Sequence, residues 1–303
     1  MGIRLKFLVP IVITVFVLGI ASYVVINRQL DSLATMNITA QMEAKAQEVD
    51  NGITQAAGAA LELAASFSQL PDVLEAYRMA HEGDLNDEKD AQSLAARELI
   101  RAKLSGAAAG YKAVFGKNLE LHYHLPTARS LVRLWRAKNH KVGRSGAPVK
   151  GIEVGRGGFA IRGLAPVKDA TGKQLGSVEA LADFDAVLKT ASGQGKQNLI
   201  LYMNAELGKI ATGLKDPVKN PVLDDSFILV TGTDDRHVED LVTASFLRRG
   251  VSGLAVEQKG DTALAAFPVR DYKGEQIGVI VYALDIAPVH AIIGGVSTTL
   301  LLV

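Results

Sequence analysis

The sequence predicts an α+β protein in which a long N-terminal helix precedes two tandem antiparallel-sheet modules, with a membrane-spanning helix at each end. The main observation is an internal duplication, because the segment 166–176 returns without a gap at 268–278, 102 positions later. Each copy has the pattern strand, Asp-x-x-Gly turn, strand, which is typical of a β-hairpin. A period of about 100 residues indicates tandem domains rather than a solenoid. A heptad stripe and an apolar segment at each end support the remaining elements.

Length and composition narrow the classes of protein. A chain of 303 residues can hold two domains of ordinary size. The net charge of +1 gives no sign of a polyanionic partner, and no basic-aromatic stripe is present, so we expect no nucleic-acid binding. Cysteine is absent, which removes disulfides and thiolate metal sites.

The N-terminal segment is long enough to anchor the chain in a membrane. Residues Phe7–Ile26 carry no charge, and about 20 such residues cross a bilayer as a helix. Arg4 and Lys6 precede the segment, which favours a cytoplasmic N-terminus. A signal peptide cleaved after residues 19–21 is the alternative. The apolar run continues past that point, so an anchor is favoured.

The C-terminal segment repeats this pattern. Residues 286–303 again carry no charge, and we expect them to begin a second, truncated membrane-spanning helix. A buried C-terminal helix of the second module is the alternative. With two membrane helices, residues of about 28–288 would lie outside the membrane.

A heptad stripe follows the first apolar segment. Its apolar residues alternate in spacing between four and three, and they are Met42, Ala46, Val49, Ile53, Ala56, Ala60, Leu63, Phe67 and Leu70. A mean spacing of 3.5 is typical of a seam between supercoiled helices, which favours a homodimer. Packing on the chain's own modules is the alternative. Pro71 ends the helix, because the residue before proline is disfavoured in the α region.

The remaining elements define the domain boundaries. We expect further helices at 71–81 and 87–108, then strands at 119–125, 131–135, 159–167 and 174–183 and a short helix from 184. In the second copy we expect strands at 198–204, 227–231, 253–258, 262–269 and 276–284, and one helix at 237–249. The predicted organisation is a membrane helix (1–27), a helical stalk (28–110), a membrane-distal module (111–195), a membrane-proximal module (196–286) and the start of a second membrane helix (287–303).

Catalytic motifs are missing from the sequence. It contains no His-Glu-x-x-His, no Gly-x-Ser-x-Gly and no phosphate-binding loop, so we expect no enzymatic activity and no cofactor. The Gly-rich stretch 151–158 lies between strands, where a turn is favoured over a nucleotide site. His122 and His124 could touch one metal ion, but the sequence names no third ligand, so a polar sheet face is favoured and no metal is predicted.

Arginines and a tryptophan form the most suggestive constellation. Arg133 and Trp135 are expected on one strand face, and Arg162 on another strand. Arginine suits the recognition of carboxylates, and tryptophan supplies an apolar wall, so we predict a site for a small organic anion or an amino acid. The predicted ligand-binding residues are His124, Arg133, Trp135, Arg162, Glu179 and Asp183. The alternative is that the arginines pair with Glu120, Glu153 and Glu179 on a solvated surface.

Four segments carry a resemblance to a known family: 121–136, 149–158, 161–163 and 176–179. They resemble the third double Cache family of bacterial transmembrane receptors, especially methyl-accepting chemotaxis proteins. Residues 264–274 of the second copy are similar to the closing hairpin of Cache modules.

The resemblance implies two PAS-like modules, a small-molecule pocket in the membrane-distal module, a homodimer and a place in the bacterial inner membrane. It also implies a chemotaxis kinase and adaptor as partners of a cytoplasmic region. The input domain of a sensor histidine kinase or diguanylate cyclase is the first alternative. A membrane-anchored extracytoplasmic enzyme is the second.

Overall fold

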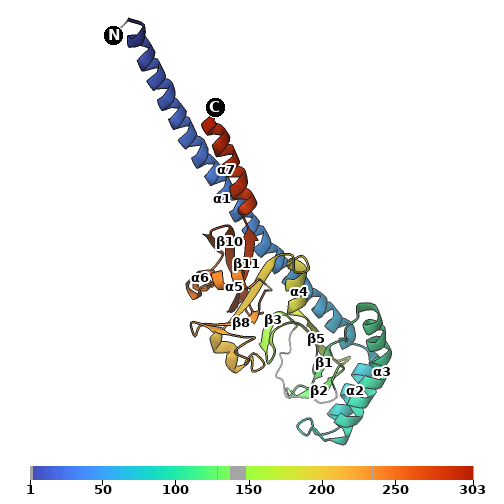
Figure 1. Cartoon of the computed structure of the whole chain (residues 1–303). Coiled ribbons are helices and arrows are strands. Elements are labelled where there is room, and N and C mark those ends of the chain that lie inside the picture. Colours follow the sequence, from blue (N-terminus) through green and yellow to red (C-terminus); the bar gives the residue numbers. More distant parts are fainter. Residues whose placement is uncertain (1–2, 128, 137–147, 234, 303) are drawn as a thin grey trace.

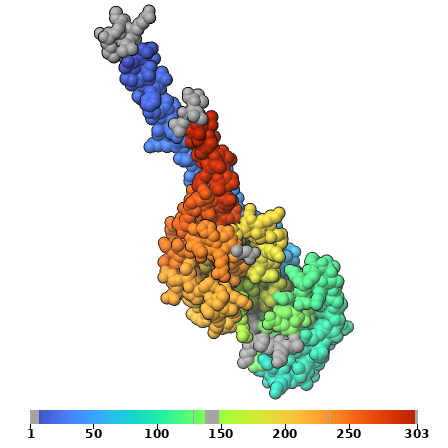
Figure 2. Space-filling model, viewed as in Figure 1, coloured from blue at the N-terminus to red at the C-terminus, as the bar shows by residue number. Residues whose placement is uncertain are grey.

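The computed structural model describes residues 3–127, 129–136, 148–233 and 235–302. A long helix, α1 (Ile3–Ser68), runs past two sheet modules, and its N-terminal part projects beyond them beside α7 (Ala287–Leu302) (Figure 1). Helices α2 (Pro71–His81) and α3 (Ala91–Phe115) lie at the far end. In the space-filling view, the second module lies next to the two projecting helices, α7 and the N-terminal part of α1. Helices α2 and α3 and the first module form the lobe farthest from them (Figure 2). The predicted fold class is confirmed.

The N-terminal part of α1 has the properties of a membrane segment. Among the described residues, α1 is the one helix long and apolar enough to cross a membrane. Apolar side chains such as Phe16, which is 68% exposed, cover this part on all sides. Helix α7 is shorter and largely exposed, with Ile292 68% exposed, so it is not a buried helix of the second module. Its role as a second membrane helix stays a prediction.

The heptad stripe of α1 packs inside the chain. Met42 and Val49 are buried in a core that α1 shares with both sheets, and Ala60 is buried in a second core with the first sheet. The preferred interpretation, in which this stripe is a seam between two chains, is therefore wrong for the stripe itself. The two sheets offer apolar faces that the stripe covers. The homodimer stays a prediction without support from this pattern.

The first module is a sheet of five antiparallel strands in the order β2-β1-β5-β4-β3. Its strands are β1 (Leu121–His124), β2 (Ser130–Arg133), β3 (Val149–Gly155), β4 (Gly158–Lys168) and β5 (Gln174–Ala182), followed by α4 (Phe184–Ala191). Tyr123, Ala165 and Val178 pack with α1, α2 and α3 in one core. Because side chains alternate along a strand, the residues between them point to the opposite face.

The second module is a sheet of six strands in the order β7-β8-β6-β11-β10-β9. Its strands are β6 (Asn198–Asn204), β7 (Val222–Leu223), β8 (Phe227–Thr231), β9 (Ala255–Lys259), β10 (Thr262–Arg270) and β11 (Gln276–Asp285), with a short 3₁₀ helix at Ala205–Lys209. One face packs on α1, and the other is covered by α5 (Arg236–Leu241) and α6 (Ala244–Gly250). The single helix predicted here is two helices, because Val242 is extended and the hydroxyl of Thr243 caps α6 by accepting from the Phe246 amide (3.2 Å).

The duplicated hairpins form as predicted. Gly172 and Gly274 occupy the turns with φ of 84° and 85°, a region that favours glycine. In each turn the aspartate, Asp169 or Asp271, accepts backbone hydrogen bonds from the residues that follow it. The local sequence alone therefore sets this part of both modules.

Helix α1 touches the first sheet with its backbone. A Cβ atom added to Gly163 in β4 would lie 2.0 Å from the amide nitrogen of Leu61 and 2.2 Å from the carbonyl carbon of Ala60. No side chain fits into such a gap. The absence of a side chain at Gly163 therefore sets the distance between α1 and the sheet.

We expect Gly163→Ala to lower the free energy of unfolding by about 3 kcal/mol, the upper end of the range for an overpacked core. The added methyl group meets helix backbone, which cannot swing aside. Gly157→Ala is the matched control, because nothing lies within 4 Å of a Cβ added there. Denaturant unfolding of both variants measures the difference, and equal stabilities would contradict the close packing.

We expect Tyr77→Phe to lower the free energy of unfolding by about 1–3 kcal/mol, because it leaves buried carbonyl groups without their donor. The Tyr77 hydroxyl donates to the carbonyl oxygens of His124 (2.9 Å) and Ser177 (3.0 Å), which joins α2 to β1 and β5. Burial raises the Tyr77 pKa well above its usual value, so the phenol stays protonated. Tyr272→Phe, at a 43% exposed residue, is the control. A Tyr77→Phe protein as stable as this control would rule out the role of the hydroxyl.

Candidate functional site

The face of the first sheet that points away from α1 carries titratable side chains. In the register of the strands, His122 lies opposite Glu179 and Arg133, and His124 lies opposite Ser177. Paired residues share a face, so the two histidines and Glu179 meet. His122 and Glu179 are each 2% exposed, and His124 is fully buried. The polar sheet face that the sequence favoured for the histidines is therefore a buried one.

The histidines and the carboxylate are in close contact. His122 Nδ1 lies 3.4 Å from Glu179 Oε2, and His124 Nε2 lies 3.7 Å from the same oxygen. The two imidazole rings are 3.8 Å apart between centroids. On its other side, His122 Nε2 is 2.8 Å from the hydroxyl oxygen of Ser130, a hydrogen bond that fixes the ring. The result is a small, rigid group of nitrogen and oxygen donors.

Two arginines complete what we call the polar cluster, defined as His122, His124, Arg133, Arg162 and Glu179. Arg162 Nη1 donates to Glu179 Oε1 (2.8 Å) and lies 3.4 Å from Glu153 Oε2. Arg133 Nε donates to His122 Nδ1 (3.4 Å). The expected alternative, pairing of arginine with Glu153 and Glu179, is therefore present for Arg162, on a face that is buried at Glu179 and partly exposed at Glu153.

Trp135 lies at the margin of this cluster. Strand β2 ends at Arg133, and the amide of Arg136 donates to the Arg133 carbonyl (3.4 Å), which closes a turn. The prediction placed Trp135 on the strand, but it lies in the turn that follows β2. Its ring meets that of His122 edge-on at 6.3 Å between centroids. It remains near enough to the cluster to form an apolar wall.

Asp183 lies apart from the polar cluster. Strand β5 ends at Ala182, and Asp183 caps α4, where its carboxylate accepts from the amide of Asp185 (3.0 Å). The structure thus brings together His124, Arg133, Arg162 and Glu179 of the predicted site, with Trp135 beside them, and it leaves Asp183 out. Sequence reasoning did not include His122 and Ser130 among the ligand-binding residues. The sequence also predicts a basic, Gly-rich loop at 139–151, and most of it lies outside the described residues.

In the second module, the positions that correspond to four residues of the polar cluster carry apolar or aromatic side chains. Moving by the 102 positions of the duplication, Arg162 corresponds to Leu264 and Glu179 to Val281. Through the strand pairing of Val281 with Ile200, the counterparts of His122 and His124 are Ile200 and Tyr202. These four counterparts are buried in one apolar core with α5 and α6, and they are Ile200, Tyr202, Leu264 and Val281. Burying polar groups at such positions is unfavourable unless they gain partners, which indicates a function.

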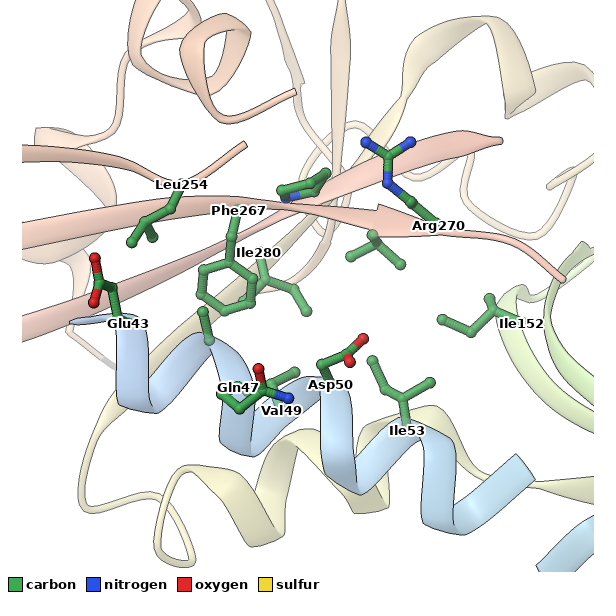
Figure 3. A pocket seen from close by; sticks show the side chains of 13 residues that line it. Glu43, Gln47, Val49, Asp50, Ile53, Ile152, Leu254, Phe267, Arg270 and Ile280 are labelled. Carbon is green, nitrogen blue, oxygen red and sulfur yellow. The ribbon is translucent and has the colours of Figure 1, made fainter. Parts of the chain in front are cut away.

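A separate cavity of about 460 Å³ lies between α1 and the second sheet. Figure 3 shows Glu43 and Asp50 of α1 on one side of it, and Phe267 and Arg270 of β10 on the other. The charged groups at this cavity are exposed, and its floor is aliphatic. It therefore lacks the buried, mutually fixed donors of the polar cluster, which remains the better candidate site.

Several solved structures resemble the chain at low sequence identity. The periplasmic domain of Vibrio cholerae LuxQ aligns with a TM-score of 0.45 and 9% identity, covering 80% of this chain and 98% of that one. The extracellular domain of the putative histidine kinase vpHK1S-Z8 aligns with 0.47 and 12%, covering 86% and 98%. The ligand-binding domain of the Pseudomonas fluorescens chemoreceptor CtaA, in complex with L-alanine, aligns with 0.38 and 14%, covering 82% and 97%.

No curated protein matches the sequence at a significant level. The dCache_3 family, described as the double sensory domain of two-component sensor kinase, matches residues 124–289, which is more than half of the chain. This range begins within β1 and contains both hairpins. The chain therefore belongs to this family of double Cache sensory domains.

Proposed function

We propose that the chain is the extracytoplasmic region of a transmembrane receptor, which binds a small polar molecule in its membrane-distal module and passes occupancy to α1. The observation that carries the proposal is the burial of His122, His124 and Glu179 of the polar cluster, at positions whose counterparts in the second module belong to an apolar core. Membership of a sensory family agrees with it. In this proposal the apolar part of α1 lies in the bacterial inner membrane, and residues of about 28–288 lie outside it.

The polar cluster and α1 are connected through two adjacent residues of β4. Arg162 holds Glu179 on the site face, and the next residue of β4, Gly163, meets the backbone of α1 on the other face. A ligand that competes for Arg162 or Glu179 would shift β4 against the helix. Such a ligand moves the receptor only as far as its affinity differs between two arrangements of the helix.

The charges of the cluster define a class of ligand. Arg133 and Arg162 supply cations and Glu179 a carboxylate, so the site suits a small organic anion or an amino acid, which carries both charges. Trp135 would bound its apolar part. No catalytic motif supports turnover, and we propose binding without catalysis.

The signalling output is proposed from the sequence resemblance. The segments of the first module resemble methyl-accepting chemotaxis proteins, which supports a chemoreceptor with a kinase and an adaptor as cytoplasmic partners. The description of the family favours a second candidate, the input region of a sensor histidine kinase. A cytoplasmic region with a long heptad-rich methylation helix is expected in a chemoreceptor alone, so the presence or absence of such a region in the receptor decides between them.

We expect Arg133→Ala to weaken the binding of an amino acid or dicarboxylate by about ten- to 100-fold, because a hydrogen bond to a charged group contributes about 1.5–3 kcal/mol. Calorimetry on the full chain in detergent, against a panel of both compound classes, measures this. Arg248→Ala is the matched control, since Arg248 pairs with Asp224 on the surface of the second module.

Equal affinity of the Arg133→Ala and Arg248→Ala proteins would contradict the assignment of Arg133. Chemical conversion of the bound compound would support the rival proposal of an extracytoplasmic enzyme. If no compound of either class binds, the proposed ligand class is wrong.

A further inference from the structure

We propose that His122, His124 and Glu179 bind a divalent transition-metal ion of the zinc type. The proposal names a ligand for the same face as the sensor site, and its role in signalling rests on the proposed function. The binding itself does not. Among the described residues, these three are the group whose donor atoms all lie within 4.8 Å of one another.

The spacing of the donor atoms suits a single small ion. Zinc binds imidazole nitrogen and carboxylate oxygen at about 2.0–2.2 Å, and tetrahedral ligands are then about 3.3–3.6 Å apart. The distances from Glu179 Oε2 to His122 Nδ1 and to His124 Nε2 are 3.4 Å and 3.7 Å. Because the donor atoms of all three residues lie within 4.8 Å of one another, rotations of the side chains would bring them to bonding distance of one ion.

The surroundings of the three ligands orient them for a metal. Ser130 holds His122 through Nε2, which directs the opposite nitrogen, Nδ1, toward Glu179. Arg162 holds Glu179 through Oε1, which leaves Oε2 turned toward the histidines. Partners of this kind fix the orientation of ligands in known metal sites. Here the contacts of Ser130 and Arg162 turn His122 Nδ1 and Glu179 Oε2 toward each other.

Arg133 couples the metal to the organic ligand. Its Nε donates to His122 Nδ1, the same lone pair that a metal ion would use. Arg133 is half-buried and has a long side chain, so it can swing away when an ion enters. Its positive charge also opposes a cation. We therefore infer that Arg133→Ala strengthens metal binding while it weakens binding of an anion.

The number of ligands suits a site that accepts a further molecule. Of the residues that the structure describes, two imidazoles and one carboxylate would bind the ion, and these three leave at least one position for a further ligand, as in catalytic zinc sites. Water or the carboxylate of an amino acid could fill it. Nitrogen and oxygen donors without sulfur suit zinc, nickel, cobalt or iron rather than copper(I).

The test uses the full chain in detergent, without a histidine tag and after treatment with a chelator. Titration with Co²⁺, followed by its visible absorption, and with Zn²⁺, followed by calorimetry, should show one ion per chain. Glu179→Gln and His124→Gln should each weaken binding by at least about 100-fold, and Ser130→Ala by about ten- to 100-fold. His237→Ala, at an exposed histidine of the second module, should bind as the parent does.

A further variant distinguishes loss of the metal ligands from unfolding of the protein. It carries the residues of the sister module at four positions: His122→Ile, His124→Tyr, Arg162→Leu and Glu179→Val. Because these residues form an apolar core in the second module, we expect this variant to melt cooperatively and to bind no Co²⁺. If it retains the Co²⁺ spectrum, the ion lies elsewhere and the proposal is wrong.

The outcomes separate the metal site from the sensor function. Absence of Co²⁺ and Zn²⁺ binding, or binding unchanged in Glu179→Gln and His124→Gln, overturns the metal site. If the metal-free protein still binds an organic compound, and loses it in Arg133→Ala, the proposed function stands without the metal. Stronger Zn²⁺ binding in Arg133→Ala supports the metal site even if no organic compound binds.

Discussion

The structure depends on the direct contact between the backbone of α1 and strand β4. Gly163 leaves no room for a side chain against Ala60 and Leu61, so helix and sheet touch without an adjustable layer between them. The same helix continues along the second sheet, where Met42 and Val49 are buried, and then into the apolar segment. Both modules and the apolar segment are therefore attached to one continuous helix.

The duplication shows how one fold serves two roles. In the second module, the face away from α1 is filled by α5 and α6, and its core is apolar. In the first module, the same face carries two buried histidines and a buried glutamate, which contact two half-buried arginines. The modules also contact each other, since the amide of Tyr272 donates to the Ile152 carbonyl (3.0 Å) and that of Gly213 to the Arg156 carbonyl (2.7 Å). The second module thus contacts both the first module and α1 and supports their relative position.

Local patterns predicted much of the fold, and tertiary contacts decided the rest. The two hairpins followed from the Asp-x-x-Gly turns, because turn and register are set within a few residues. The burial of His122 and His124 could not be predicted from their alternation with apolar neighbours, which is equally typical of a strand with one solvated face. Glu179 and Asp183 are both acidic residues of the predicted strand 174–183, so the sequence does not distinguish their roles. They differ because the sheet pairs Glu179 with His122, while Asp183 follows the end of its strand. The heptad stripe fits a partner helix and a pair of sheets equally well.

Hydrogen exchange along α1 tests the central claim, that the helix is a part of both modules rather than a free stalk. Backbone amides in contact regions open with the unit to which they belong. The account predicts that residues 42–67 of α1 exchange with the same opening free energy as β4 and β5 in the native full-length chain. Exchange of these helix amides in a separate step of lower energy, with both sheets still protected, would contradict it.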